Sequence, residues 1–343
     1  YTPLHGTGLE PVTKTFRRMK GIQFTCVTEQ TTPDGHFPTC PKPNPELREA
    51  LRCGLELAEK ENASLLIATD PDCDRVGVAV REKDGRYTVL TGNEVGLLLL
   101  EHILKTRTAL GTMPENPVVV KTIVTSDLAF AIARRYGAEV TECLTGFKYI
   151  GQQILGFEQS GKGTYLFGFE ESYGCLIGTH ARDKDAIVAT MALCEAAAYY
   201  KTQGKTLWDA MIDMYEKYGY YKDDIQSITL KGIEGLEKIQ SILETLRKNP
   251  PKEIGGYQVT SARDYKLDTI RNMATGEITE TGLPKSNVLY YDLTDDAWLC
   301  VRPSGTEPKV KFYYGVKGTS LADADEKSKA LGEKVLEMIH QML

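Results

Sequence analysis

The chain has 343 residues, of which 41% are hydrophobic and 26% charged, and its formal net charge is −6. This composition is ordinary for a globular protein, and the length is typical of two or three domains. The acidic balance argues against a general nucleic-acid-binding protein, and no apolar run approaches the length that a membrane span needs. We therefore expect neither nucleic acid nor a membrane as a partner.

The cysteines indicate the compartment. The 8 cysteines show no Cys-x-x-Cys pair and no regular spacing. This pattern fits reduced thiols better than a disulfide framework, and no signal peptide is visible. We predict a cytoplasmic location. The chain starts at Tyr1 inside a turn rich in Pro and Gly, from which we expect a fragment or a processed product.

The first part of the chain mixes helical and strand patterns. Asn44 and Pro45 predict a helix start, with Asn as N-cap and Pro at the first helical position. An apolar stripe at helical spacing follows, namely Leu47, Leu51, Leu55 and Ala58. The elements that we expect here are a helix at 10–19, a strand at 22–27, a proline-rich loop at 31–45, the helix from Pro45 onward, and strands at 64–69 and 76–82.

Strands and helices then alternate as far as residue 200. We expect strands at 87–90, 117–124, 138–143 and 165–169, and helices at 93–105, 126–136, 148–157 and 185–200. This alternation, together with that of the first part of the chain, predicts α/β units with mainly parallel sheets.

After about Gly219 short strands follow one another. We expect strands at 225–230, 258–262, 288–291, 298–301 and 310–314, and helices at 235–248 and 322–342. This order predicts a smaller α+β domain with an antiparallel sheet.

Three aspartates, Asp70, Asp72 and Asp74, follow directly on the predicted strand 64–69. Carboxylates this dense repel one another unless a cation holds them, and oxygen ligands favour a hard ion such as Mg²⁺. Arg75 comes next and indicates a phosphate nearby. The sequence therefore predicts a metal site for a phosphorylated substrate at the end of a strand, where α/β sheets bind their ligands.

Two other interpretations compete for this segment. An EF-hand loop also begins Asp-x-Asp-x-Asp, but it needs Gly at its sixth position and Glu at its twelfth. Those positions hold Arg75 and Arg81, so we reject the EF-hand. An acidic surface turn stays open as an alternative, although apolar residues flank the aspartates on both sides.

A second polar loop, Gly168-Phe-Glu-Glu-Ser-Tyr-Gly174, also follows a predicted strand. Glu170 and Ser172 share one side of an extended chain, because side chains alternate with a period of two. Both could fix the hydroxyl groups of a polyol. A polar hairpin turn is the alternative.

A third loop, from Arg302 to Lys309, follows the predicted strand 298–301. Arg302 offers a planar fork to phosphate. Ser304 and Thr306 add hydroxyl groups, and Gly305 lets backbone N–H groups approach an anion. The sequence predicts a phosphate-binding loop, with a surface turn as the alternative.

Two further segments lie at predicted strand-to-helix turns. His180, Arg182 and Lys184 precede the helix that begins near Asp185, and their cations could contact phosphate or move a proton. A solvated charged loop is the alternative. The segment 145–148 lies at another such turn, a natural ligand-binding edge.

Taken together, these loops resemble the α-D-phosphohexomutase family of phosphoglucomutases and phosphomannomutases. The order and spacing of Asp70-Pro-Asp-Cys-Asp-Arg75, Glu170-Glu-Ser172 and Arg302-Pro-Ser-Gly-Thr306 match the family's metal, sugar and phosphate loops. The resemblance implies a C-terminal portion: residues 1–84 as an incomplete domain 2, 85–218 as domain 3 and 219–343 as domain 4. The family's catalytic phosphoserine lies in a Thr-Ala-Ser-His-Asn-Pro type loop of domain 1, which has no counterpart in this sequence.

The resemblance also implies site residues. Asp70, Asp72 and Asp74 would hold Mg²⁺ together with the phosphoserine. Arg75 would contact the transferring phosphoryl group, and Lys184 is a candidate general acid/base. The implied substrate-binding residues are Thr145, Gly146, Glu170, Ser172, His180, Arg302, Ser304, Gly305, Thr306 and Lys309. Two departures are Cys73, where Ala or Gly is usual, and Ala186, where Gly follows Lys-Asp in the better-known phosphoglucomutases.

The implied activity is an intramolecular transfer of phosphate between O1 and O6 of a hexose. Glucose 1,6-bisphosphate would serve as intermediate and activator, and Glu-Glu-Ser leans toward glucose 1-phosphate and glucose 6-phosphate over mannose or pentose phosphates. Without the catalytic serine, the chain alone is expected to be inactive. A non-catalytic sugar-phosphate-binding module and phosphopentomutase specificity are the alternatives.

Overall fold

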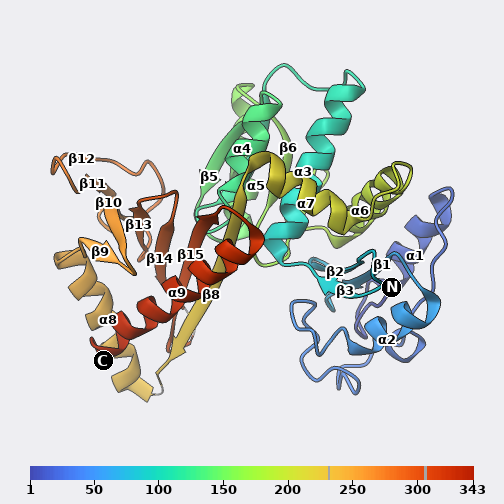
Figure 1. Cartoon of the computed structure of the whole chain (residues 1–343), viewed down its shortest axis with the longest axis horizontal. Coiled ribbons are helices and arrows are strands. Elements are labelled where there is room, and N and C mark those ends of the chain that lie inside the picture. Colours follow the sequence, from blue (N-terminus) through green and yellow to red (C-terminus); the bar gives the residue numbers. More distant parts are fainter. Residues whose placement is uncertain (231, 305–306) are drawn as a thin grey trace. The chain divides into compact units, whose positions relative to one another are not determined.

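The computed structural model describes residues 1–230, 232–304 and 307–343. The chain forms two compact units, unit 1 (Tyr1–Tyr218) and unit 2 (Gly219–Leu343). Figure 1 labels their helices and strands. None of the helices formed by the described residues is long and apolar enough to cross a membrane.

Unit 1 begins with a small antiparallel sheet, in which β2 lies between β1 and β3. The elements of this part are α1 (Leu9–Arg18), η1 (Thr28–Gln30), α2 (Arg52–Glu61), β1 (Leu65–Thr69), β2 (Val76–Arg81) and β3 (Tyr87–Val89). Helix α2 packs on the sheet through Leu55, which shares a buried core with Leu51 and Leu66. Strand β1 ends at Thr69, directly before residues 70–75, which we call the aspartate loop.

A second, mainly parallel sheet follows in unit 1, with the strand order β5-β4-β6-β7. The elements are α3 (Gly92–Ala109), β4 (Pro117–Thr122), α4 (Leu128–Arg135), β5 (Glu139–Cys143), α5 (Phe147–Ser160), β6 (Thr164–Phe169), β7 (Cys175–Ile177), α6 (Ala186–Lys201) and α7 (Leu207–Tyr218). Strand β4 pairs in parallel with both β5 and β6, and β7 is antiparallel to β6. After β4 the chain forms β5 on one side of β4, and it then crosses to form β6 on the other side. The loops after β4 and β6 therefore flank a topological switch point, where α/β sheets bind ligands.

Side-chain caps fix the helices around this sheet. Thr91 and Glu94 form a reciprocal capping box at the start of α3, which satisfies N–H groups that a helix start leaves unpaired. At the start of α6 the carboxylate of Asp185 accepts the N–H groups of Ile187 at 2.8 Å and Val188 at 3.2 Å. The loop before α6, which carries Lys184, thus ends at a defined point.

The described residues of unit 2 form one sheet and two helices. Its elements are β8 (Tyr220–Thr229), α8 (Gly232–Lys248), β9 (Glu253–Ile254), β10 (Tyr257–Asp264), β11 (Thr269–Asn272), β12 (Ile278–Thr279), β13 (Leu289–Leu293), β14 (Trp298–Pro303), β15 (Lys309–Gly318) and α9 (Leu321–His340). The strand order is β12-β11-β10-β13-β14-β15-β8, with β9 paired to β10. Both helices contribute to the core on one face of the sheet, where Leu243 and Val335 meet Leu299 and Phe312.

The predicted fold class is confirmed: unit 1 is α/β, and the C-terminal part carries an antiparallel sheet. The prediction of parallel pairing is wrong for the first sheet, where Leu65 lies opposite Val80 and Thr69 opposite Val76 in antiparallel register. The physical reason is the short connection from Asp70 to Arg75. A parallel neighbour needs a crossover of a dozen or more residues.

Two further predictions in unit 1 are wrong. Residues 22–27 form no strand; their extended backbone bonds locally, with the Val27 N–H donating to the Tyr1 carbonyl at 2.9 Å. The helix predicted from Pro45 begins only at Arg52, because residues 44–51 form successive β-turns, such as the one closed by the Leu47 N–H donating to the Asn44 carbonyl at 3.0 Å. The elements that the sequence analysis did not predict are η1, β7, α7, β9, β11 and β12.

Candidate functional site

The aspartate loop is held by hydrogen bonds to the buried Asp70. Its carboxylate accepts the N–H groups of Asp74 at 3.0 Å and Arg75 at 2.9 Å, and the Arg75 Nε at 2.7 Å. Cys73 has a positive φ of 63°, and its N–H donates to the Asp70 carbonyl at 3.0 Å. The chain therefore curls back so that Asp72 and Asp74 project beside Asp70.

The three carboxylates fit a metal ion. One oxygen atom from each of Asp70, Asp72 and Asp74 lies within 4.8 Å of the other two. Arg75 also faces Glu46 at 3.5 Å, and Lys184 faces Asp183 at 2.9 Å. Five carboxylates thus surround two cations, which gives a formal net charge of −3. A divalent cation with oxygen ligands would offset much of this charge.

The site joins the aspartate loop to Lys184. The Lys184 Nζ lies 2.9 Å from an oxygen of Asp74, and the guanidinium of Arg75 lies 3.6 Å from the other. Burial alone would lower the pKa of Lys184, but its ion pairs with Asp74 and Asp183 raise it. Burial raises the pKa of Asp70 to about 6, although hydrogen bonds from Arg75 act in the opposite direction. The two catalytic candidates therefore flank the predicted metal ligands.

Main-chain contacts fix the second polar loop and the start of α6 against the aspartate loop and the strand that follows it. The Val76 N–H donates to the Tyr173 carbonyl at 3.1 Å, and the Ala186 N–H donates to the Cys73 carbonyl at 3.3 Å. Sterics favour glycine at position 174, because a Cβ there would lie 2.1 Å from the Cδ of Lys184. The glycine leaves the passage through which Lys184 reaches Asp74.

Glu170 links the sugar loop predicted at 168–174 to the turn at Thr145 and Gly146. Its buried carboxylate accepts the Gly146 N–H at 2.9 Å, while its own N–H donates to the Gly174 carbonyl at 2.9 Å. Gly146 has a φ of 123°, a backbone conformation that favours glycine. Ser172 and Thr145 are half-buried. These predicted residues thus lie in contacting loops, although Glu170 uses one oxygen within the protein.

The loop from Gly178 to Asp185 is fixed by ion pairs. His180 Nε2 lies 2.8 Å from the Asp185 carboxylate, which also caps α6. The Arg182 Nη2 donates to both carboxylate oxygens of Glu158, at 2.7 and 2.6 Å, and the Nη1 donates to the Thr179 carbonyl at 2.7 Å. Arg182, which the sequence suggested as a phosphate contact, instead attaches the loop to α5.

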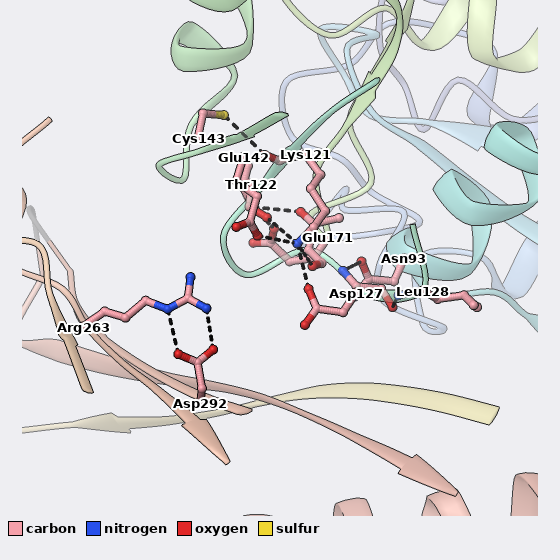
Figure 2. A network of polar contacts seen from close by, with 12 residues as sticks. Asn93, Lys121, Thr122, Asp127, Leu128, Glu142, Cys143, Glu171, Arg263 and Asp292 are labelled. Carbon is pink, nitrogen blue, oxygen red and sulfur yellow. Dashed lines mark hydrogen bonds and ion pairs between the residues drawn. The ribbon is translucent and has the colours of Figure 1, made fainter. Parts of the chain in front are cut away.

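Sequence reasoning missed a buried polar network at the carboxyl end of β4. Figure 2 shows the ammonium group of Lys121 among oxygen atoms: Glu142 at 2.8 Å, Asp127 at 3.0 Å and the Thr125 carbonyl at 3.0 Å. Lys121 is 0% exposed. The Thr122 hydroxyl lies 3.4 Å from a Glu171 oxygen, which joins this network to the sugar loop. The signal was a lysine inside the apolar strand pattern of 117–124.

In unit 2 the predicted phosphate loop presents a cluster of cations. Arg302 lies directly opposite Lys311 on the neighbouring strand, and Lys309 shares that face because it lies two residues from Lys311. Within residues 1–230, 232–304 and 307–343, none of these three cations has an ion-pair partner; Arg302 reaches only the Tyr313 hydroxyl at 3.5 Å. Like charges on one face favour an anion. Lys311 was not predicted, although Lys309 and Lys311 alternate at strand spacing.

The backbone of the phosphate loop is described on both sides of its centre. The Ser304 N–H donates to the Lys309 carbonyl at 2.7 Å, and the Glu307 N–H donates to the Ser304 Oγ at 3.2 Å. Gly305 and Thr306, two of the predicted binding residues, lie outside the described residues.

On the same sheet Arg263 makes a forked ion pair with Asp292 (Figure 2), and its guanidinium lies 4.6 Å from the Tyr290 ring centroid.

Comparison with known proteins identifies the family. Residues 1–85 match the α/β/α domain II of phosphoglucomutase/phosphomannomutase, and residues 91–218 match its α/β/α domain III. The chain belongs to the phosphoglucomutase/phosphomannomutase family. It is 37% identical over 331 residues to a phosphoglucomutase of Staphylococcus aureus strain MSSA476, an alignment that covers 96% of this chain and 59% of the relative.

Solved structures of the same fold extend the likeness to nearly the whole chain. A family protein from Burkholderia thailandensis matches with a TM-score of 0.63 and 17% identity, covering 99% of this chain and 60% of that one. Parafusin from Paramecium, a phosphoglucomutase, matches with a TM-score of 0.61 and 15% identity, covering 98% and 60%. The fold is therefore shared with proteins that are only 15% and 17% identical to this chain.

Proposed function

We propose that this chain carries the metal, sugar and phosphate loops of a phosphohexomutase that interconverts hexose 1-phosphate and hexose 6-phosphate. The observation that carries the proposal is the convergence of Asp70, Asp72 and Asp74 with Arg75 and Lys184 around one point of unit 1. The resemblance to phosphoglucomutases along 331 residues supports it. Glucose phosphates are the proposed substrates, and glucose 1,6-bisphosphate the proposed intermediate and activator.

In this proposal the aspartate loop holds Mg²⁺. The ion, when bound, supplies charge stabilisation for the transferring phosphoryl group. Arg75 adds a planar cation next to the same group, and its orientation is fixed by Asp70 at 2.7 Å. Lys184 reaches the edge of the loop and is the candidate general acid/base that faces the sugar hydroxyl. Positioning and charge supply most of the catalysis in phosphoryl transfer.

Substrate recognition is divided between two loops. Glu170 and Ser172, with Thr145, Gly146 and His180, face the sugar, and the charged acceptor Glu170 fixes ring hydroxyls. Arg302, Ser304 and Lys309, with Gly305 and Thr306, hold the phosphate that is not transferred. Because the phosphate of either isomer occupies the same clamp in turn, one set of cations serves both directions of the reaction.

The phosphate acceptor of the family, a serine in a Thr-Ala-Ser-His-Asn-Pro type loop, is not found among these 343 residues. The chain spans 59% of the length of its S. aureus relative. We therefore propose that the chain alone does not turn over glucose 1-phosphate, and that a longer protein that includes the preceding domain does so.

A coupled assay of that longer protein tests the proposal. Conversion of glucose 1-phosphate to glucose 6-phosphate should require Mg²⁺. Its rate should fall by about a hundredfold or more in Asp72→Asn. Asp84→Asn is the matched control, since Asp84 is an exposed turn residue whose ion-pair partner within the described residues is Arg86. Full activity of Asp72→Asn, or equal losses in both variants, would contradict the assignment of the metal loop.

A further inference from the structure

A charged hollow on unit 1 is lined by residues outside the loops described above. Its volume is about 450 Å³, and it is lined by Ala131, Arg134 and Arg135 of α4 and by Lys217 and Tyr218 of α7. None of these residues belongs to the aspartate, sugar or phosphate loops, so the proposed mutase reaction does not use it.

The wall of the hollow is built on a buried carboxylate. Glu101 of α3, whose side chain is 8% exposed, accepts the Tyr218 hydroxyl at 2.8 Å and the Lys217 Nζ at 2.9 Å. The Tyr136 hydroxyl, at the end of α4, donates to the same carboxylate at 2.7 Å. One carboxylate thus fixes the last turn of α7 and the end of α4, and the ammonium of Lys217 lies 4.6 Å from the Tyr218 ring centroid.

The hollow has an excess of positive charge. Three cations line it, Arg134, Arg135 and Lys217, and within the described part of the chain their one ion-pair partner is Glu101, which binds Lys217. Three positive charges against one negative charge leave a formal balance of +2. Both arginines are exposed, and the Lys217 side chain is 39% exposed, so a ligand can reach all three.

A pair of arginines at the end of a helix is common, since cations there complement the helix dipole. Helix α1 ends in the same way, with Arg17 and Arg18. What distinguishes α4 is the hollow beside its arginines and the third cation, Lys217, which a different helix contributes and a buried carboxylate holds in place.

We propose that this hollow is a binding site for a small phosphorylated anion carrying at least two negative charges. Guanidinium forks match phosphate oxygens in a bidentate manner, and the volume lies in the range of small-molecule sites, roughly 300–1,000 Å³. Tyr218 and the methyl group of Ala131 provide an apolar wall for the rest of the ligand.

The test is a calorimetric titration with inorganic pyrophosphate in a Mg²⁺-free buffer. All proteins carry Arg302→Ala, which weakens the proposed phosphate loop of unit 2. The charge variant is Arg134→Gln with Arg135→Gln, and the matched control is Arg17→Gln with Arg18→Gln, which removes the same charge from another helix end. A third variant, Ala131→Leu, keeps all charges and fills the hollow.

The proposal expects the Arg302→Ala protein to bind one pyrophosphate per chain. Affinity should fall at least about tenfold in the Arg134/Arg135 variant and in Ala131→Leu, because each removes a charge-assisted contact or its space. The Arg17/Arg18 control should bind like its parent. Thermal melting of each variant verifies that it is folded. If the Arg134/Arg135 variant does not fold, the affinity of Ala131→Leu tests the proposal in its place.

Three results would overturn the proposal. The first is no pyrophosphate binding once Arg302 is replaced. The second is an equal loss in both double variants, which would indicate diffuse electrostatics in place of a site. The third is unchanged affinity in Ala131→Leu. None of these outcomes depends on mutase activity, so this site and the proposed function fail independently.

Discussion

At the scale of single residues, Lys121 is the side chain whose loss we expect to cost unit 1 most stability. It is wholly buried and donates to two carboxylates and two carbonyls at the end of β4. Lys121→Met would leave Glu142 and Asp127 without their shared cation. We predict a drop of about 3 kcal/mol in the free energy of unfolding, the low end for a broken buried pair, because both carboxylates keep some access to water.

Urea unfolding followed by Trp208 fluorescence measures this loss. Trp298→Phe serves as the background, since the chain has 2 tryptophans and Trp208 then reports on unit 1 alone. The matched control is Lys83→Met, which breaks the ion pair of the exposed Lys83 with Asp209 and should cost less than about 1 kcal/mol. Equal effects of the two substitutions would mean that the Lys121 network contributes nothing special.

Glu170→Gln separates sugar recognition from phosphate binding. Glutamine retains an oxygen that accepts the Gly146 N–H, so the loop should stay in place. The charge offered to sugar hydroxyls is lost, and we predict on the order of tenfold weaker binding of glucose 6-phosphate. Inorganic phosphate should bind as before. Competition titrations measure both ligands, with exposed Glu139→Gln as control; equal losses for both ligands would show that Glu170 is structural.

The sequence predicts single site residues unevenly. Asp70, Asp72 and Asp74 could be predicted because their close spacing after a strand is typical of a metal-binding loop. The pairing of Arg182 with Glu158 was not, since 24 residues separate them and only the folded loop brings them together. Lys121 gave a visible signal, a charge within an apolar strand, but its partners Asp127 and Glu142 come from two other segments.

At the scale of elements, helix α3 depends on its N-terminal cap. The Glu94 N–H donates to the Thr91 hydroxyl at 3.2 Å, and the Glu94 carboxylate accepts the Thr91 N–H at 2.7 Å. Thr91→Ala should lower the free energy of unfolding of unit 1 by about 1 kcal/mol. Urea unfolding in the Trp298→Phe background measures it. Thr108→Ala near the other end of α3 is the control and should change stability by less than about 0.5 kcal/mol; a loss as large as that of Thr91→Ala would refute the role of the cap.

Elements with strong periodicity were predicted well, and those decided by tertiary contacts were not. The buried strand β4 and the helices α5 and α6 lie close to their predicted ranges. The helix expected from Pro45 fails because Asn44 and Pro45 open a series of tight turns, a choice that local cap chemistry alone does not decide. Helix α7 was missed although Thr206 and Asp209 bond reciprocally at its start, a signal of the capping-box type.

At the scale of the whole molecule, unit 2 has its own core. The buried cluster that joins α8 and α9 to the sheet draws every member from residues 239–339. We predict that residues 219–343 expressed alone fold and unfold cooperatively, with Trp298 as the single reporter. Circular dichroism and Trp298 fluorescence should give the same urea midpoint. Non-coincident transitions, or no transition, would mean that unit 2 needs unit 1 to fold.

The most direct test of the central claim is whether one clamp serves both isomers of the substrate. Calorimetry should show that the chain binds glucose 1-phosphate and glucose 6-phosphate with affinities within about threefold of each other. Arg302→Ala should weaken both by on the order of ten- to a hundredfold, since a charge-assisted hydrogen bond contributes about 1.5–3 kcal/mol. Exposed Arg271→Ala, on another strand of the same sheet, should leave both unchanged. Binding of only one isomer, or binding of both that survives Arg302→Ala, would contradict the assignment of this chain as the substrate-holding part of a phosphohexomutase.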